Sequence, residues 1–153
     1  MERIRRMAEP RRDFVRKVVM RLIVSPQHHF AQSHDAIKAT ALSDEILIVR
    51  EPGSGSREVV TQALGLHAIE PKQTLEIGST EAIKQAVAAG LGVSVVSRAA
   101  ISDQLKLGRL RAIAMQDLQI ERTLWQLQSP GRISIPAATA FDRILWQDQP
   151  AHE

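Results

Sequence analysis

The chain has 153 residues, 44% of them apolar and 24% charged, which is enough to bury the core of one compact domain. It has no Cys, so disulfides, cysteine-ligated metals and a cysteine nucleophile are excluded. The formal net charge is +3, and residues 1–17 hold seven cations against three acids, so the positive charge belongs to the N-terminal leader.

This basic leader, residues 1–17, is expected to be disordered. Arg16, Lys17 and Arg21 interrupt the apolar residues of the segment FVRKVVMRLIV, which argues against a secretory signal. No stretch approaches the roughly 18 apolar residues that a membrane-spanning helix needs. An arm that binds nucleic acid or an acidic partner is the alternative interpretation of the leader.

After the leader, predicted strands and helices alternate along the chain. β-Branched and apolar runs predict strands at residues 18–25, 45–51, 73–78, 93–97, 110–115 and 121–129. Apolar residues at helical spacing predict helices at residues 56–64, 79–90, 99–108 and 137–146. The short connections predict an α/β fold with an open, doubly wound, mostly parallel sheet covered by helices.

Three of the predicted helices, all but the one at residues 99–108, carry a recognisable apolar face, which we expect to be buried. The tryptophans Trp125 and Trp146 are expected in the core or at a lobe interface. The residues that form the apolar faces are Val59, Val60, Ala63, Leu64, Ile83, Ala86, Val87, Phe141, Ile144 and Leu145.

Two loops rich in Gly and hydroxyl side chains join predicted strands to predicted helices, and parallel topology places both at one edge of the sheet. Helix starts offer unpaired N–H groups and partial positive charge, so these loops predict a site for a small anion or carboxylate. The alternative is that the hydroxyls only cap the helices, with Glu58 and Glu81 already complementing the dipoles. The candidate binding residues are Gly53, Ser54, Gly55, Ser56, Gly78, Ser79 and Thr80.

Two arginines flank the first of these loops. Arg50 and Arg57 could clamp an anion through their guanidinium groups. The alternative, which we favour slightly, is that they pair with Glu51, Glu58 or another surface acid.

No catalytic constellation emerges from the sequence. Glu58 stands at the third glycine position of the GxGxxG pattern that Gly53 and Gly55 begin, and phosphate-loop and nucleophile-elbow motifs are missing. We therefore expect neither an enzyme nor a bound cofactor. His28, His29 and His34 lack helical spacing and a clear carboxylate partner, so we expect solvated loop histidines and no metal site.

Four segments together resemble the effector-binding domain of LysR-type transcriptional regulators: ILIVREPGSGSREV, LEIGSTEAIKQAVAAGLGVSVVSR, LGRLRAI and ERTLWQL. The resemblance runs from about residue 19 to residue 145 in family order. It implies a type 2 periplasmic-binding-protein fold, in which two crossover strands join two α/β lobes around a small effector. The family segment SPxHPLA is present as SPQHHFA, with His29 where Pro is usual.

On this resemblance, residues 18–44 are the outgoing crossover strand and its loop, and residues 45–119 are a complete effector-binding lobe. Residues 120–153 are the returning strand and the C-terminal helix of an incomplete lobe. Family effector contacts match the loops at residues 52–56 and 78–80. The winged helix-turn-helix and most of the first lobe are not recognised, so the chain looks like a truncated regulator.

The resemblance implies a cytoplasmic, non-enzymatic domain that senses a small anionic metabolite or an inorganic anion. Without a recognition helix, this chain is expected neither to bind DNA sequence-specifically on its own nor to bind a membrane. The apolar surface of an incomplete lobe favours a homo-oligomer. The alternatives are a non-functional or self-associating fragment and a solute-binding protein of the same fold.

Overall fold

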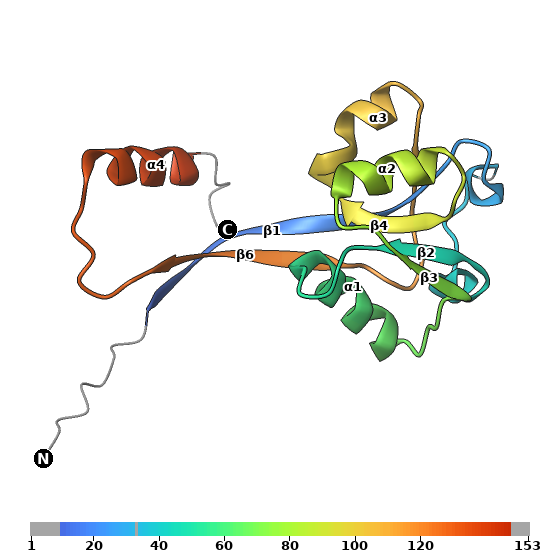
Figure 1. Ribbon diagram of the computed structural model, residues 1–153, viewed down its shortest axis with the longest axis horizontal. Coiled ribbons are helices and arrows are strands. Elements are labelled where there is room, and N and C mark those ends of the chain that lie inside the picture. Colours follow the sequence, from blue (N-terminus) through green and yellow to red (C-terminus); the bar gives the residue numbers. More distant parts are fainter. Residues whose placement is uncertain (1–9, 33, 148–153) are drawn as a thin grey trace, which may run out of the picture. The chain divides into compact units, whose positions relative to one another are not determined.

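The computed structural model describes residues 10–32 and 34–147 (Figure 1). The chain divides into two compact units, of which one is Val18–Arg122 and the other combines Met1–Lys17 with Thr123–Glu153. Residues 1–9 of the predicted leader lie outside the described residues. In the part of the chain that is described, no helix has the length and apolar character needed to cross a membrane.

The sheet has the strand order β3-β2-β4-β1-β5, and the sixth strand, β6, pairs with β1. β2 is parallel to β3 and β4, whereas β1 is antiparallel to both β4 and β5. Four strands of this path therefore run in one direction and β1 runs against them, so the sheet is mostly parallel. The strand bounds are β1 Arg11–Val24, β2 Ile46–Val49, β3 Gln73–Glu76, β4 Val93–Ser97, β5 Arg111–Ile113 and β6 Glu121–Gln128.

Four α-helices form where the sequence predicts helices. The predicted helix at residues 99–108 is split, because a 3₁₀ helix, η3, precedes a short α3. Two further 3₁₀ helices, η1 and η2, occupy the polar stretch after β1. The helix bounds are α1 Gly55–Leu66, α2 Thr80–Ala88, α3 Ser102–Lys106, α4 Pro136–Gln147, η1 His29–Ala31, η2 Ala39–Asp44 and η3 Arg98–Ile101.

The core of residues 18–122 has two layers, because successive strand side chains point to opposite faces of the sheet. In β2, Leu47 belongs to one buried cluster and Ile48 to the other. Helix α1 covers the first cluster through Val60, and α2 covers the second through Val87. The two helices lie on opposite faces of the sheet (Figure 1), as expected for a doubly wound arrangement.

The first strand begins at Arg11, well before the predicted start at Val18. The described end of the basic leader is therefore extended strand, which corrects the expectation of disorder for these residues. Val15 is buried, and the Phe14 ring meets Trp125 of β6 edge to face with 5.9 Å between centroids. These ring and strand contacts hold the segment in place. The many cations of the segment led to the prediction of disorder, because composition does not reveal such contacts.

The prediction of a core position for Trp125 and Trp146 is wrong, since 47% and 38% of their surfaces are exposed. Phe141 and Ile144 of α4 are exposed as well, and none of the described α4 side chains is buried. Within the unit that holds them, the described residues contribute strand ends and one helix. So few elements leave most of the large apolar side chains in this unit exposed, although Val15 is buried.

Candidate anion-binding site at the sheet edge

The two predicted loops leave the sheet at the same edge. β2 and β3 are parallel neighbours, with Val49 of β2 opposite Glu76 of β3 in the register. Each strand is followed by a loop that opens a helix, α1 after β2 and α2 after β3. The parallel register therefore brings both helix N-termini, with their unpaired N–H groups and partial positive charge, to one edge.

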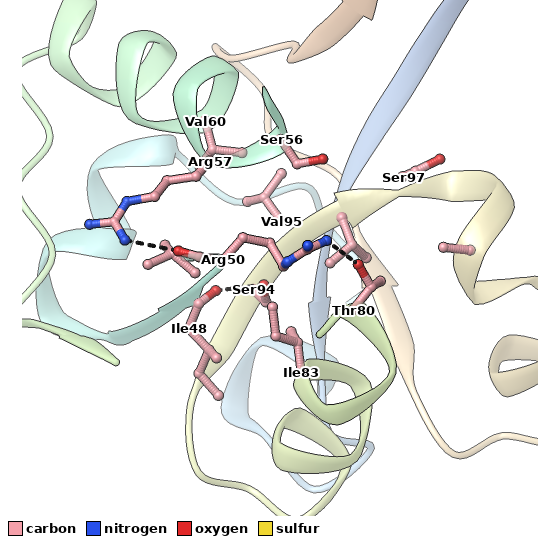
Figure 2. Close-up of a pocket in the computed structure, with 13 residues that line it drawn as sticks. Ile48, Arg50, Ser56, Arg57, Val60, Thr80, Ile83, Ser94, Val95 and Ser97 are labelled. Carbon is pink, nitrogen blue, oxygen red and sulfur yellow. Dashed lines mark hydrogen bonds between the residues drawn. The ribbon is translucent and has the colours of Figure 1, made fainter. Parts of the chain in front are cut away.

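A pocket of about 80 Å³ lies at this edge (Figure 2). Its apolar lining includes Ile48, Val60 and Ile83, while its polar groups come from both loops and from β4. This volume is enough for a small anion or a few waters and too small for a dinucleotide. The polar side chains that line it are Arg50, Ser56, Arg57, Thr80, Ser94 and Ser97.

Arg50 bridges the two loops. Its Nη1 donates to Thr80 Oγ1 at 3.0 Å, while Nε and Nη2 donate to the Glu51 carboxylate at 2.7 and 2.9 Å. The hydrogen bonds to Glu51 raise the pKa of Arg50, and the same bonds hold the pKa of the Glu51 carboxyl below its ordinary value. Arg50 is therefore a fixed cation at the pocket, partly neutralised by its neighbour.

Arg57 has different partners. Its Nη1 donates to the Arg50 carbonyl at 2.9 Å and to Glu76 Oε2 at 2.8 Å. Figure 2 shows the two guanidinium groups pointing in opposite directions. Pairing with neighbouring acids, the alternative to a joint clamp, is thus what this structure contains for both arginines.

The remaining predicted site residues shape the loops and do not line the pocket. Ser54 occupies the N-cap position of α1, and Ser79 caps α2 by accepting a hydrogen bond from the Ala82 amide at 3.4 Å. Gly53 has a φ of +85°, a conformation that other residues rarely adopt. A Cβ on Gly55 would lie 2.9 Å from Arg122 Nη2, which would have to move, whereas one on Gly78 would lie at an ordinary contact distance of 4.0 Å from Glu51 Oε2.

Ser94, Ser97 and Arg122 were not predicted as site residues. Ser94 and Ser97 lie on β4, the other parallel neighbour of β2, so the predicted strand at residues 93–97 already held a signal for them. Arg122 Nη1 donates to Ser56 Oγ at 3.2 Å across 66 positions of sequence. No local sequence pattern predicts this contact between Arg122 and Ser56.

His28 and His29 differ from the prediction, whereas His34 is exposed. His28 is half-buried and its Nε2 lies 3.2 Å from Glu45 Oε2, so it has the carboxylate partner that the sequence did not reveal. His29 is exposed, yet its Nε2 lies 3.2 Å from the other oxygen of Glu45. Seventeen positions separate His28 from Glu45, and the fold brings them together.

Comparison with known proteins shows the family to which the chain belongs. The family model described as "LysR substrate binding domain" matches residues 11–149. The HTH-type transcriptional regulator CbbR of Rhodospirillum rubrum is 38% identical over 104 residues, which cover 68% of this chain and 35% of the relative. CbbR of Rhizobium meliloti is 36% identical over 146 residues, which cover 91% of this chain and 46% of the relative. The chain therefore spans between about a third and a half of these relatives.

Among solved structures, the regulatory domain of CcmR from Synechocystis PCC6803, in complex with 2-PG, superposes with a TM-score of 0.76 and 27% identity. The match covers 94% of this chain and 68% of the CcmR chain. The mostly parallel sheet with helices on both faces is thus the fold of known effector-binding domains. Because the family model covers nearly the whole chain and the similar proteins are transcriptional regulators, this chain belongs to the family of LysR substrate-binding domains.

Proposed function

We propose that residues 18–122 bind a small anion, a carboxylate or an inorganic oxyanion, in the pocket between the two helix N-termini. The observation that carries the proposal is the Arg50–Thr80 hydrogen bond, which fixes a guanidinium group between the two loops at the pocket. A fixed guanidinium beside a helix start is a strong anion-binding combination, since both charge and directed N–H donors face the ligand.

The local charge supports an anionic ligand. Arg50 and Arg57 line the pocket and Arg122 donates to Ser56 Oγ, whereas the carboxylates bound to the first two arginines are Glu51 and Glu76. An incoming carboxylate or oxyanion can replace Glu51 on Arg50 without leaving a buried charge unpaired, because Glu51 is close to solvent. The pocket volume of about 80 Å³ restricts the part of the ligand held here to a small group.

The comparisons support a role in sensing. The relatives are named as transcriptional regulators, and the CcmR regulatory domain was solved with the small molecule 2-PG. We propose that ligand binding by this chain likewise serves the regulation of transcription.

Isothermal titration of the full chain with phosphate, sulfate, acetate and small dicarboxylates tests the binding proposal. At least one of these anions should bind, and Arg50→Gln should weaken that binding about tenfold or more. The matched control is Lys72→Gln, which removes an exposed cation just before β3, at the other end of that strand. Absence of binding to every anion, or equal binding by Arg50→Gln and the wild type, would contradict the proposal.

Self-association is a second candidate property, supported by a different observation. Apolar side chains of β6, α4 and the segment between them are exposed, namely Leu127, Ile133, Ile135, Phe141 and Ile144. Exposed apolar residues in such number favour association between copies. Sedimentation velocity over a range of concentrations should show a homo-oligomer, and a monomer throughout that range would contradict it.

A further inference from the structure

A second cluster of polar side chains lies at the edge of the sheet opposite Arg50. Glu45 directly precedes β2, and His28 and His29 lie at the start of η1, shortly after β1. β1 is antiparallel to β4, which is parallel to β2, so the end of β1 and the start of β2 meet at one edge. The cluster is therefore separated from the candidate anion pocket by the length of β2.

The three side chains present their donor atoms to one another. The Nε2 atoms of His28 and His29 lie 3.2 Å from Glu45 Oε2 and Oε1 respectively, and one ligand atom from each residue falls within 4.8 Å of the others. Tetrahedral zinc with bonds of about 2.0–2.2 Å places neighbouring ligand atoms roughly 3.3 Å apart. Each nitrogen–oxygen separation is close to that spacing, and because the two run to different oxygens of Glu45, one ion would bind both oxygens or draw the ligand atoms slightly closer together.

The surroundings hold the rings in position. The His28 and His29 rings stack with 4.3 Å between centroids, and the Phe30 ring packs against both. The side chains of His28 and Glu45 are only 16% and 12% exposed, while that of His29 is 69% exposed. An ion would thus meet two ligands in a sheltered place and a third on the open side, where water could complete the coordination.

Hydrogen bonds hold the cluster together without an ion. The Phe30 amide donates to His28 Nδ1 at 3.2 Å, so His28 carries its proton on Nε2 and donates it to Glu45. A metal on Nε2 takes the place of that proton, which moves to Nδ1, and the ring gives up the Phe30 hydrogen bond. The ligand atoms are already gathered, and the cost of binding is one hydrogen bond at the start of η1.

We propose that His28, His29 and Glu45 form a binding site for a divalent transition metal, with Zn²⁺ as the best match. Two imidazoles and one carboxylate are a common ligand set for this ion, and they leave one position for water. The segment SPQHHFA departs from the pattern SPxHPLA at His29 and Phe30, so that pattern does not include the second imidazole. The bound ion would tie the turn after β1 to the start of β2.

The proposal is tested by titrating Zn²⁺ into the full, untagged chain by calorimetry, with Co²⁺ absorption spectra to report tetrahedral nitrogen and oxygen coordination. One Zn²⁺ should bind to the site, and His29→Gln should weaken this binding about tenfold or more. His29 is the preferred position because its exposed side chain can be replaced without disturbing the core. Glu45→Gln, checked for folding by circular dichroism, should weaken binding as well.

His67→Gln is the matched control, since it removes an exposed histidine at the C-terminal end of α1. It should bind Zn²⁺ as the wild type does. No Zn²⁺ binding by the wild type, or undiminished binding by His29→Gln, would overturn the proposal.

Discussion

Arg50 Nη1 donates a hydrogen bond of 3.0 Å to Thr80 Oγ1, and this bond joins the loop after β2 to the start of α2. The two residues are 30 positions apart and meet because β2 and β3 are parallel neighbours. The bond orients the guanidinium group toward the pocket at no further entropic cost when a ligand arrives.

Replacing Thr80 by Val removes the hydroxyl while keeping the branched shape. We expect Thr80→Val to bind the ligand anion about 3- to 10-fold more weakly, because Arg50 loses the hydrogen bond that ties it to the second loop. Thr80→Ser keeps the hydroxyl and should bind as the wild type does. Calorimetric titration with the anion that binds most tightly measures the effect, and equal affinity of Thr80→Val and the wild type would show that the bond does not matter for binding.

Glu51→Gln should have the opposite effect on anion binding. The Glu51 carboxylate holds Nε and Nη2 of Arg50, so its neutralisation leaves a stronger positive charge at the pocket. Anion affinity should rise about 3- to 10-fold at low salt and by less at high salt, where the charge is screened. An unchanged or lowered affinity in the same titration would argue against competition between Glu51 and the ligand.

The Glu51 carboxyl also predicts a dependence of stability on pH. Its hydrogen bonds from Arg50 lower its pKa below the ordinary value of 4.5. A carboxyl with a lowered pKa stabilises the folded state above its unfolded pKa, and this contribution is lost as pH falls through the folded pKa. Urea denaturation of the wild type and of Glu51→Gln should therefore show a difference in unfolding free energy that shrinks below about pH 4.5. If the difference in unfolding free energy between the wild type and Glu51→Gln did not change with pH, the Glu51 carboxyl would not contribute to the pH dependence of stability.

Lys84 is the source of a second pKa shift. Its nearly buried Nζ lies 2.6 Å from Glu81 Oε2 and donates to the Ala100 carbonyl at 3.0 Å. The hydrogen bond from Lys84 is the largest cause of the lowered pKa of Glu81, and one from Gln85 is the next. In an NMR titration, the Glu81 pKa should rise toward 4.5 in Lys84→Met, and by less in Gln85→Ala. An unmoved Glu81 titration in Lys84→Met would contradict this assignment.

Replacing Gly92 and Gly65 by alanine should change the stability of the fold in opposite directions. A Cβ on Gly92 would lie 2.5 Å from the Ile46 carbonyl oxygen of the neighbouring strand, so Gly92→Ala should destabilise the fold by about 2 kcal/mol or more. A Cβ on Gly65, near the end of α1, meets nothing within 4 Å. Gly65→Ala should stabilise by about 0.5–1 kcal/mol, since alanine favours the helix. Urea denaturation measures both, and a Gly92→Ala variant as stable as the wild type would contradict the close approach.

Local sequence predicted most of the elements and the edge of the sheet at which the candidate site lies. Apolar spacing located α1 and α2 and their buried faces, because the faces of a helix follow from residues three and four apart. The shared edge of the two loops followed from parallel topology, which short strand–helix connections impose. Ser56 and Thr80 therefore reach one pocket as predicted, although assignment of the other loop residues to ligand contact stays a prediction.

The tertiary structure decided which side chains meet. Strand order brings together residues that are far apart in sequence. It determines the direction of β1, the contact between Arg122 and Ser56, and the contact between His28 and Glu45. The exposure of Trp125 likewise depends on which elements surround it and not on its apolar character. Hydrophobic periodicity predicts which face of a helix or strand is buried. Packing between elements decides which side chains contact one another across the fold, and a short stretch of sequence does not contain that information.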